Sequence, residues 1–304
     1  MSTLQGVMPI LPTIFDDAGR IDRPGTQRVL EYVIAAGAAA VVFPGLASEY
    51  DTLTMDERLE MTEALGQWVK GRLPLVIGAS AATESDAVRY AQAGAQAGAA
   101  AAMVLTPKSL AGDVSAMAGF YRGIHAASGI AIMVQNAPAP MGIGMPLAQI
   151  AAMAREVEGI RYVKEEAQPS GQRITELQRL AGDDIDAVFG GAGARYVIDE
   201  FVRGATGVMP ACEITELHVQ MHAHFARGAL PQARDLFERT LPLLNMQANF
   251  RWRLTKAVLQ RRGLIESAHV RAAGPALDAF DKAELDALLA RLCEAGLLTL
   301  PGQA

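Results

Sequence analysis

Cysteine and lysine are both scarce in this chain, which has only two cysteines and five lysines among 304 residues. Cys212 and Cys293 give neither a disulfide framework nor the spacing of metal ligands, so the sequence indicates a reducing compartment. The N-terminal residues lack the basic and apolar regions of a signal peptide, and no apolar run is long enough to cross a bilayer. We therefore expect a cytoplasmic protein without a membrane partner.

Basic clusters are absent as well. The formal net charge is −6, and no run of basic residues interrupts it, which argues against nucleic acid and against an anionic membrane surface as partners. A glycine-rich G-x-G-x-x-G turn is also missing after the first strand candidate. Residues 12–16, Pro-Thr-Ile-Phe-Asp, follow that strand instead and contain no glycine. Its absence disfavours a doubly wound open sheet that binds dinucleotides.

The sequence does have a regular alternation of short β-rich runs with helical stretches, which is typical of a parallel sheet covered by helices. Thr54 with Glu57, and Thr83 with Asp86, mark two helix starts. The strand candidates are Val7–Leu11, Ala40–Phe43, Leu75–Ile77, Ala101–Leu105, Ile130–Gln135, Tyr162–Lys164, Ala187–Phe189 and Gly207–Met209. Eight such units fit a (β/α)8 TIM barrel of the α/β class over residues 1–225, since such barrels typically need about 250 residues.

Residues 226–304 are expected to form a small C-terminal helical annex that packs on the barrel. Helical periodicity runs through Leu230–Gln247, Phe250–Arg261 and Ala276–Ala295, and β-rich runs stop.

Lys164 is the only lysine embedded in what reads as a buried strand. An ammonium group at the buried end of a strand loses solvation, which makes the neutral, nucleophilic amine accessible. Such a lysine can condense with a carbonyl to give a Schiff base. The alternative is a lysine that extends to solvent and pairs with Glu165 or Glu166. The other four lysines stand in ordinary places, Lys256 among them in amphipathic helical sequence.

Polar and glycine-rich positions gather where the expected strands end. Gln135 and Asn136 end the fifth strand, the loop 45–49 follows the second, and Gly190 with Gly191 ends the seventh. The chemistry of a barrel takes place at the C-terminal ends of its strands. This convergence favours a catalytic Lys164.

In these motifs the chain resembles the dihydrodipicolinate synthase / N-acetylneuraminate lyase family, the class I Schiff-base aldolases and dehydratases, over residues 6–300. The matching segments, in order, are Pro12–Phe15, Gly45–Glu49, Gln135–Pro138 with Gly142, Val163–Glu165, Gly204–Gly207, and Lys256 with Gly263. The resemblance implies a TIM barrel, a Schiff base on Lys164 and a 2-keto acid substrate. It also implies that no cofactor is needed and that the protein is a homo-oligomer, commonly a tetramer.

The departures from the family pattern concern the proton relay and the dicarboxylate site. Gln135 replaces the relay tyrosine, and the arginine that binds a dicarboxylate in the true synthases falls at Pro140. The pattern is more similar to the L-2-keto-3-deoxyarabonate dehydratase branch, which has the glutamine, a Ser-Glu pair like Ser48-Glu49, and a glutamate like Glu166. Asn136 and Glu165 differ from that branch.

A glutamine in place of the tyrosine favours elimination over carbon–carbon cleavage. Retro-aldol cleavage needs a base on the C4 hydroxyl, and an amide cannot exchange protons at neutral pH, although it can hold a hydroxyl or a carboxylate. Elimination needs a carboxylic acid near C3 and C4. Glu166 is the candidate because alternation from Lys164 places it on the same face, and Glu49 is the second candidate. A rim hydrogen bond is the structural alternative for each.

Backbone N–H groups of Ala47 and Ser48, with the Ser48 hydroxyl, are expected to hold the substrate carboxylate. Gly190 and Gly191 either let the chain approach the substrate or form a tight turn.

Three functional hypotheses follow. The first is a dehydratase of a 2-keto-3-deoxy sugar acid in carbohydrate catabolism. The second is an aldolase, or a condensing enzyme of the dihydrodipicolinate synthase type. The third is a barrel that binds a keto acid without turnover. The run His218, His222 and His224 lacks a metal-ligand set and is expected on an outer helix, so we expect no metal site.

Overall fold

The protein is described here by a computed structural model, which covers residues 3–301. Residues 1–2 and 302–304, at the ends of the two expected domains, lie outside it.

Capping side chains fix the start of several helices. Thr54 accepts a hydrogen bond from the N–H of Glu57, whose carboxylate accepts from the N–H of Thr54 at the start of helix α2, Met55–Val69. Thr83 caps helix α3, Glu84–Gln96, through the N–H of Asp86. Both helix starts predicted from the sequence are confirmed.

Eight parallel strands form one sheet, in the order β1-β8-β7-β6-β5-β4-β3-β2. The strands are β1 Gly6–Val7, β2 Val41–Phe43, β3 Leu75–Gly78, β4 Ala101–Leu105, β5 Ala131–Asn136, β6 Ile160–Glu165, β7 Ala187–Gly190 and β8 Gly207–Val208. The predicted alternation of eight parallel strands with helices is confirmed.

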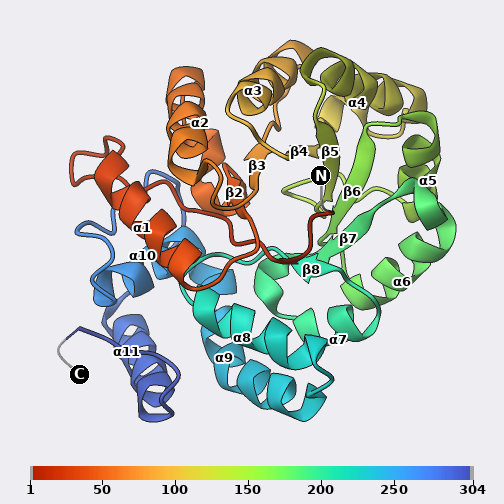
Figure 1. Ribbon diagram of the computed structural model, residues 1–304. Coiled ribbons are helices and arrows are strands. Elements are labelled where there is room, and N and C mark those ends of the chain that lie inside the picture. The colour runs from red at the N-terminus through yellow and green to blue at the C-terminus, as the bar shows by residue number, and fades with distance from the viewer. Residues whose placement is uncertain (1–2, 302–304) are drawn as a thin grey trace.

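The sheet curls on itself (Figure 1). β1 pairs with β8, and just beyond β1 the backbone of Ile10 bridges in parallel both to Val42, in β2, and to Ala211. The predicted first strand, Val7–Leu11, is therefore shorter than expected, because it reduces to Gly6–Val7 and these two isolated bridges at Ile10. The segment still brings the first and last strands of the sheet order together.

Eight helices follow the strands and lie outside the curled sheet (Figure 1). They are α1 Arg23–Ala35, α2 Met55–Val69, α3 Glu84–Gln96, α4 Val114–Ser128, α5 Leu147–Glu156, α6 Ser170–Ala181, α7 Val197–Val202 and α8 Thr215–Ala226. One apolar cluster lies between the sheet and these helices. A second, smaller cluster includes Met103, Met133, Tyr162 and Phe189, which come from four neighbouring strands. This second cluster fills the inside of the curled sheet, so residues two positions farther along the same strands also point inward.

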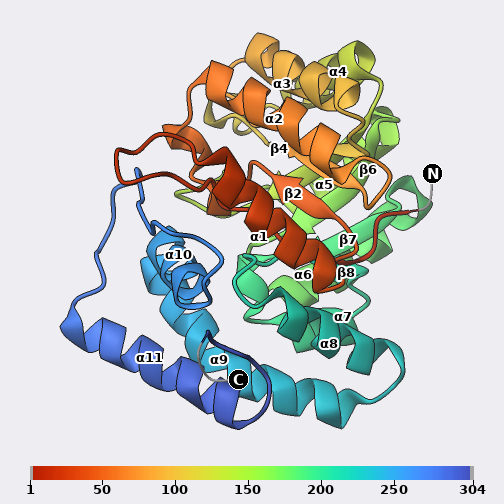
Figure 2. The same cartoon turned by 60° about the vertical axis from the view of Figure 1, so that its left-hand side comes forward.

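The last three helices form the annex and lie side by side against one flank of the sheet and its helices (Figures 1 and 2). They are α9 Leu230–Phe250, α10 Trp252–Arg261 and α11 Ala279–Glu294. The boundary expected between residues 225 and 226 falls in the last turn of α8. Within residues 3–301 we find no helix with the length and apolar character that a membrane crossing requires.

Candidate active site

Lys164 comes from β6 and points into the curled sheet. Tyr162, two residues earlier, belongs to the inner apolar cluster, so the period-two alternation of a strand sends Lys164 to the same side. In the parallel register, Gln135 of β5 is the direct partner of Lys164. The lysine side chain is 2% exposed. The predicted neighbours thus lie together, at the C-terminal ends of their strands.

Glu166 follows β6 and faces Lys164. Its N–H donates to the carbonyl of Asn136 at 3.0 Å, which continues the pairing one residue past the strand end. Its Oε1 lies 3.1 Å from Lys164 Nζ and accepts a hydrogen bond from Gln135 Nε2 at 2.5 Å. Burial alone raises the pKa of Glu166, but the charge of Lys164 and the hydrogen bonds from Gln135 and Lys164 outweigh it and hold that pKa below its ordinary value. The carboxylate is therefore ionised at neutral pH.

The predicted pair Gly190 and Gly191 packs against the side chains of Glu200 and Glu166, at positions where a Cβ atom would clash with them. A Cβ atom on Gly191 would lie 2.5 Å from Glu166 Cγ, and one on Gly190 would lie 1.9 Å from Glu200 Oε2. Neither glycine is among the residues that line the cavity described below. These glycines allow a close approach to Glu166 and Glu200. Their predicted contact with a substrate stays a prediction.

The loop after β2 differs in part from the expectation. Ala47 lines the cavity, but the Ser48 side chain is buried in the loop's own hydrogen bonds. Its hydroxyl donates to the carbonyl of Leu11 and accepts from the N–H of Gly45 at 2.9 Å, while the Ser48 N–H donates to the carbonyl of Gly45. In this arrangement neither donor of Ser48 is available to a substrate carboxylate, because both are already used. Ser48 shapes the loop that presents Ala47.

Glu165 and Asn136, which depart from the dehydratase pattern, form a buried network beside the site. Glu165 accepts from Asn136 Nδ2 at 2.8 Å and from the N–H of Ala167 at 2.8 Å, and it pairs with Arg173 Nε at 3.1 Å. Asn136 Oδ1 in turn accepts from the N–H of Met145. Burial raises the pKa of Glu165 more strongly than these partners lower it. The pair ties β5, β6 and the following loops together and so positions Gln135 and Lys164.

Glu49, the second predicted acid, has both of its oxygens engaged elsewhere. Lys256 Nζ lies 2.6 Å from its Oε1, and the N–H of Ala272 donates to its Oε2 at 2.8 Å. Both side chains of this ion pair are 0% exposed. Lys256 does lie in a helix of the annex, α10, as expected, but its environment is not ordinary, because the side chain is buried against the loop after β2.

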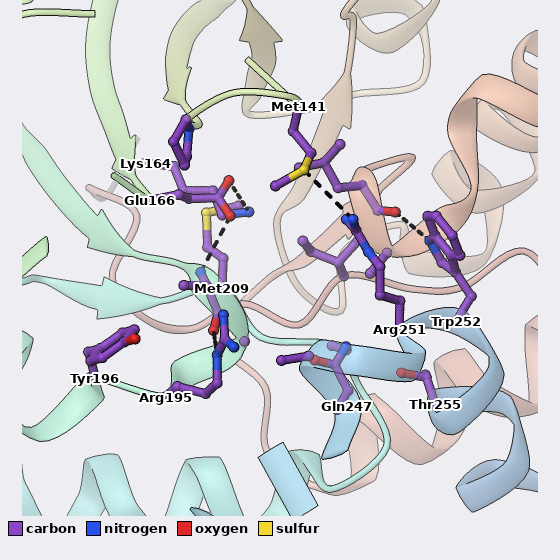
Figure 3. A pocket seen from close by; sticks show the side chains of 18 of the residues that line it. Met141, Lys164, Glu166, Arg195, Tyr196, Met209, Gln247, Arg251, Trp252 and Thr255 are labelled. Atoms are coloured by element: carbon purple, nitrogen blue, oxygen red, sulfur yellow. Dashed lines mark hydrogen bonds and ion pairs between the residues drawn. The ribbon is translucent and has the colours of Figure 1, made fainter. Parts of the chain in front are cut away.

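A cavity of about 260 Å³ opens above Lys164 and Glu166 (Figure 3). Its walls come from the curled sheet, from the loop before α7 and from the annex. The annex contributes Gln247, Arg251, Trp252 and Thr255, and the loop before α7 contributes Ala192, Gly193 and Arg195. The indole N–H of Trp252 donates to the carbonyl of Leu46 at 2.6 Å, which ties the annex to the loop after β2.

The histidine run lies on α8, and its members have different surroundings. His218 is buried on α8, and burial lowers its pKa to about 4. His222 instead packs its ring edge-on against Phe201. Across residues 3–301 there is no group of three or more His, Cys, Asp or Glu side chains that could hold a metal ion.

A model of the dihydrodipicolinate synthetase family matches residues 3–292. The chain belongs to this family. It is 31% identical to an L-2-keto-3-deoxyarabonate dehydratase of Azospirillum brasilense over 95% of this chain and 94% of that protein. It is also 28% identical to a 4-hydroxy-tetrahydrodipicolinate synthase of Sodalis glossinidius over 78% and 81% of the two chains.

Among solved structures, a Pseudomonas aeruginosa protein described as a dihydrodipicolinate synthetase superposes with a TM-score of 0.88 at 30% identity, over 96% of this chain and 100% of that one. Both the family and the similarity to the dehydratase branch, predicted from ordered motifs, are confirmed. Members of the dihydrodipicolinate synthetase family are lyases, aldolases or dehydratases, and this protein is an enzyme of that kind.

The site residues that the sequence did not reveal are those of the annex and of the loop before α7. Arg195, Arg251 and Trp252 line the cavity, but they lie in helical or loop sequence with no distinguishing motif. One local signal was present: the predicted helical stretches Leu230–Gln247 and Phe250–Arg261 leave a gap at 248–249. The break lies two residues later, at Arg251, which joins α9 to α10 with a positive φ of 50° that an arginine rarely adopts.

Proposed function

We propose that this enzyme is a Schiff-base lyase that dehydrates a 2-keto-3-deoxy sugar acid in carbohydrate catabolism. One observation carries the proposal: the ammonium of Lys164 and the amide of Gln135 share one carboxylate oxygen, Oε1 of Glu166. The site thus has a nucleophile and a carboxylate base in contact, and an amide where a phenol would be needed for cleavage. The similarity to an L-2-keto-3-deoxyarabonate dehydratase supports the same reaction.

The first step is condensation on Lys164. Glu166, 3.1 Å away, can accept a proton from the ammonium, and the free amine then attacks the C2 carbonyl of the substrate. Loss of the carbonyl oxygen as water gives an iminium between C2 and Nζ. The backbone of Ala47, at the cavity wall, is the proposed binding site for the C1 carboxylate.

The second step is elimination across C3 and C4. The iminium acidifies C3, and Glu166 removes a proton from it to give an enamine. The enamine electrons then form the C3–C4 double bond while the C4–O bond breaks, and the carboxylic acid of Glu166 protonates the departing hydroxide. Water hydrolyses the iminium and frees Lys164. One water is lost overall, since the water released on condensation is returned on hydrolysis.

Gln135 positions Glu166 without exchanging protons. An amide donates a hydrogen bond but cannot take the proton of a C4 hydroxyl at neutral pH. Tyr196, a phenol on the cavity wall, is 42% exposed and lies well apart from Lys164 in Figure 3. Among the described residues that line the cavity, no phenol therefore lies beside Lys164 to take the proton of the C4 hydroxyl, and Glu166 is the proposed base for C3, which favours elimination.

The proposed chemistry needs no cofactor, because the iminium itself takes up the electrons from C3. The curled sheet is proposed to be a (β/α)8 barrel closed through the Ile10–Val42 bridge. A homotetramer stays a prediction.

Product analysis tests the function directly. The purified enzyme is incubated with a panel of 2-keto-3-deoxy pentonates and hexonates, and the products are identified by mass. A loss of 18 Da is the expected outcome, whereas release of pyruvate with an aldehyde would establish an aldolase. Borohydride with pyruvate should add mass at Lys164, and the absence of any adduct would overturn the Schiff-base mechanism. If the protein binds the keto acids but forms no adduct and turns none of them over, it is a keto-acid-binding protein and not an enzyme of this kind.

A further inference from the structure

The walls of the active-site cavity carry more positive than negative charge. Lys164, Arg195 and Arg251 are cationic, and Glu166 is the one acidic side chain among the lining residues described. Glu166 is already paired with Lys164. Within residues 3–301, neither arginine has a carboxylate within ion-pair distance. The cavity therefore has two guanidinium charges that no protein group neutralises.

Both arginines are held by weak or partial contacts that leave donors free. Arg251 Nη1 lies 3.7 Å from Met141 Sδ, a weak acceptor, and its guanidinium lies 4.8 Å from the centre of the Trp252 ring. Arg195 donates through Nε to the carbonyl of Ala192 at 2.9 Å. One nitrogen of each guanidinium group thus makes a contact that orients the side chain. Its other N–H groups have no hydrogen-bond acceptor among the described residues. A guanidinium with a free edge matches the two oxygens of a carboxylate.

The backbone at both positions is specialised. Arg251 joins α9 to α10 at a φ of 50°, and Arg195 follows the run Ala192, Gly193 and Ala194, whose φ angles are 49°, 68° and 64°. Non-glycine residues with a positive φ are uncommon and tend to occur at ligand sites. Arg251 and Arg195 lie at these two corners of the chain and line the cavity.

A keto acid with a single carboxylate leaves both guanidinium charges without a partner. Its C1 carboxylate is bonded to the carbon that joins Lys164 Nζ, so it must remain beside Lys164. In Figure 3, Arg251 approaches from the annex side of the cavity and Arg195 from the loop before α7, both away from Lys164. The iminium charge on Lys164 is balanced by Glu166. Electrostatic complementarity then requires a second anion farther along the substrate.

We infer that Arg251, with Arg195, binds a carboxylate at the far end of the substrate, so that the enzyme takes 2-keto-3-deoxy sugar diacids in preference to monoacids that end in a hydroxymethyl group. This inference rests on the proposed Schiff-base function and narrows its substrate class. Arg251 acts as a specificity-determining residue, and the elimination at C3 and C4 is unchanged.

Borohydride trapping with matched keto acids tests the inference apart from turnover. 2-Oxoglutarate is compared with 2-oxopentanoate, and 2-oxoadipate with 2-oxohexanoate, with pyruvate as the reference that has no distal group. The concentration that gives half-maximal adduct at Lys164 should be about ten- to a hundredfold lower for the better diacid than for its monoacid, as expected for a charge-assisted hydrogen-bonded pair. The preference should weaken in high salt.

Substitutions of the two arginines test whether they cause the preference for diacids over monoacids. Arg251→Asn removes the charge and keeps an amide donor, and Arg195→Gln removes the second charge. Each should reduce the preference while pyruvate trapping stays unchanged. Arg253→Asn is the matched control, because Arg253 lies two residues away and lines a different surface cavity.

The outcomes separate the two proposals. No adduct with pyruvate would overturn the Schiff-base function itself. Pyruvate trapped normally, but diacids and monoacids trapped at equal concentrations, would overturn only the inference about the distal carboxylate. Equal weakening of diacid, monoacid and pyruvate in Arg251→Asn would also overturn it, because the arginine would then hold the C1 carboxylate that all three share.

Discussion

The protein contains two buried lysine–glutamate pairs, and they differ in what surrounds them. Lys256 and Glu49 are 2.6 Å apart and completely buried. Lys256 Nζ also donates to the carbonyl of His269 at 2.8 Å and lies 4.3 Å from the centre of the Phe15 ring. Lys164 and Glu166 are 3.1 Å apart, and Glu166 is 12% exposed at the cavity. One pair is closed by protein on every side, and the other meets an open volume.

The comparison shows that burial alone does not make a lysine reactive. Burial lowers the pKa of Lys256 to about 8 despite the charge of Glu49, yet no carbonyl compound can reach it. Lys164 has both a partner that can accept its proton and a cavity on its open side. Access, more than desolvation, separates the structural pair from the reactive one.

The largest effect should come from replacing the reactive lysine. Lys164→Arg keeps the positive charge beside Glu166 but cannot form a Schiff base, so turnover should fall by roughly 10⁴-fold or more. Pyruvate and borohydride should then add no mass anywhere in the chain. An adduct on Lys256 in this variant would show that the buried pair is accessible after all.

Glu166→Gln should reduce kcat by about a thousandfold, because the general base and acid of the elimination are lost. The adduct with pyruvate should still form, more slowly, since Lys164 is intact. Steady-state kinetics and trapping are compared in one preparation. Unchanged kcat would assign the proton transfers to another group.

Breaking the closed pair should affect stability. Lys256→Met leaves Glu49 buried without its counter-ion, and such changes cost about 3–5 kcal/mol of unfolding free energy. Urea denaturation measures the loss. The double variant Lys256→Met with Glu49→Leu should recover part of it, because no lone charge remains buried. A double variant no more stable than the single one would contradict this explanation.

Glu200 is a buried carboxyl with no lysine partner among the described residues. Ser170 Oγ donates to its Oε1 at 2.6 Å, while its Oε2 has no hydrogen-bond partner among the described residues. Burial raises its pKa to about 7 from the ordinary value of 4.5. Below pH 4.5 the carboxyl is protonated in the folded and unfolded chain alike, so its full contribution to stability is present. That contribution is lost as pH rises through 7, because ionisation then occurs inside the protein.

Glu200→Gln should therefore be as stable as the parent near pH 4.5 and more stable at pH 8, by at most about 3 kcal/mol. Unfolding in urea at the two pH values measures the difference. Equal pH dependence in the parent and the variant would show that Glu200 does not titrate in this range.

The sequence predicted those parts of the site that depend on local alternation and on strand order. Lys164, Gln135 and Glu166 were placed together because side chains alternate along a strand and parallel strands end at one edge. The helix starts at Thr54 and Thr83 could be predicted because a capping side chain bonds to a residue only three positions later. Alternation and capping both depend on residues that are close together in the sequence.

The parts that could not be predicted depend on contacts between distant segments. Lys256 reaches Glu49 across 207 positions of sequence, and Trp252 reaches Leu46 across 206. No periodicity within the annex reveals which of its faces meets the loop after β2. The Ser48 hydroxyl was assigned to a substrate because residue type alone does not show that the carbonyl of Leu11 lies beside it.

The hydrogen bond from the Trp252 indole to Leu46 gives the enzyme an optical reporter of its own active site. The chain has two tryptophans, and of these Trp252 lines the cavity. With Trp68→Phe, the remaining emission comes from an indole on the cavity wall. Filling the cavity or loosening the annex changes the water and the charges around that ring, so a fluorimeter can follow both events in unlabelled protein.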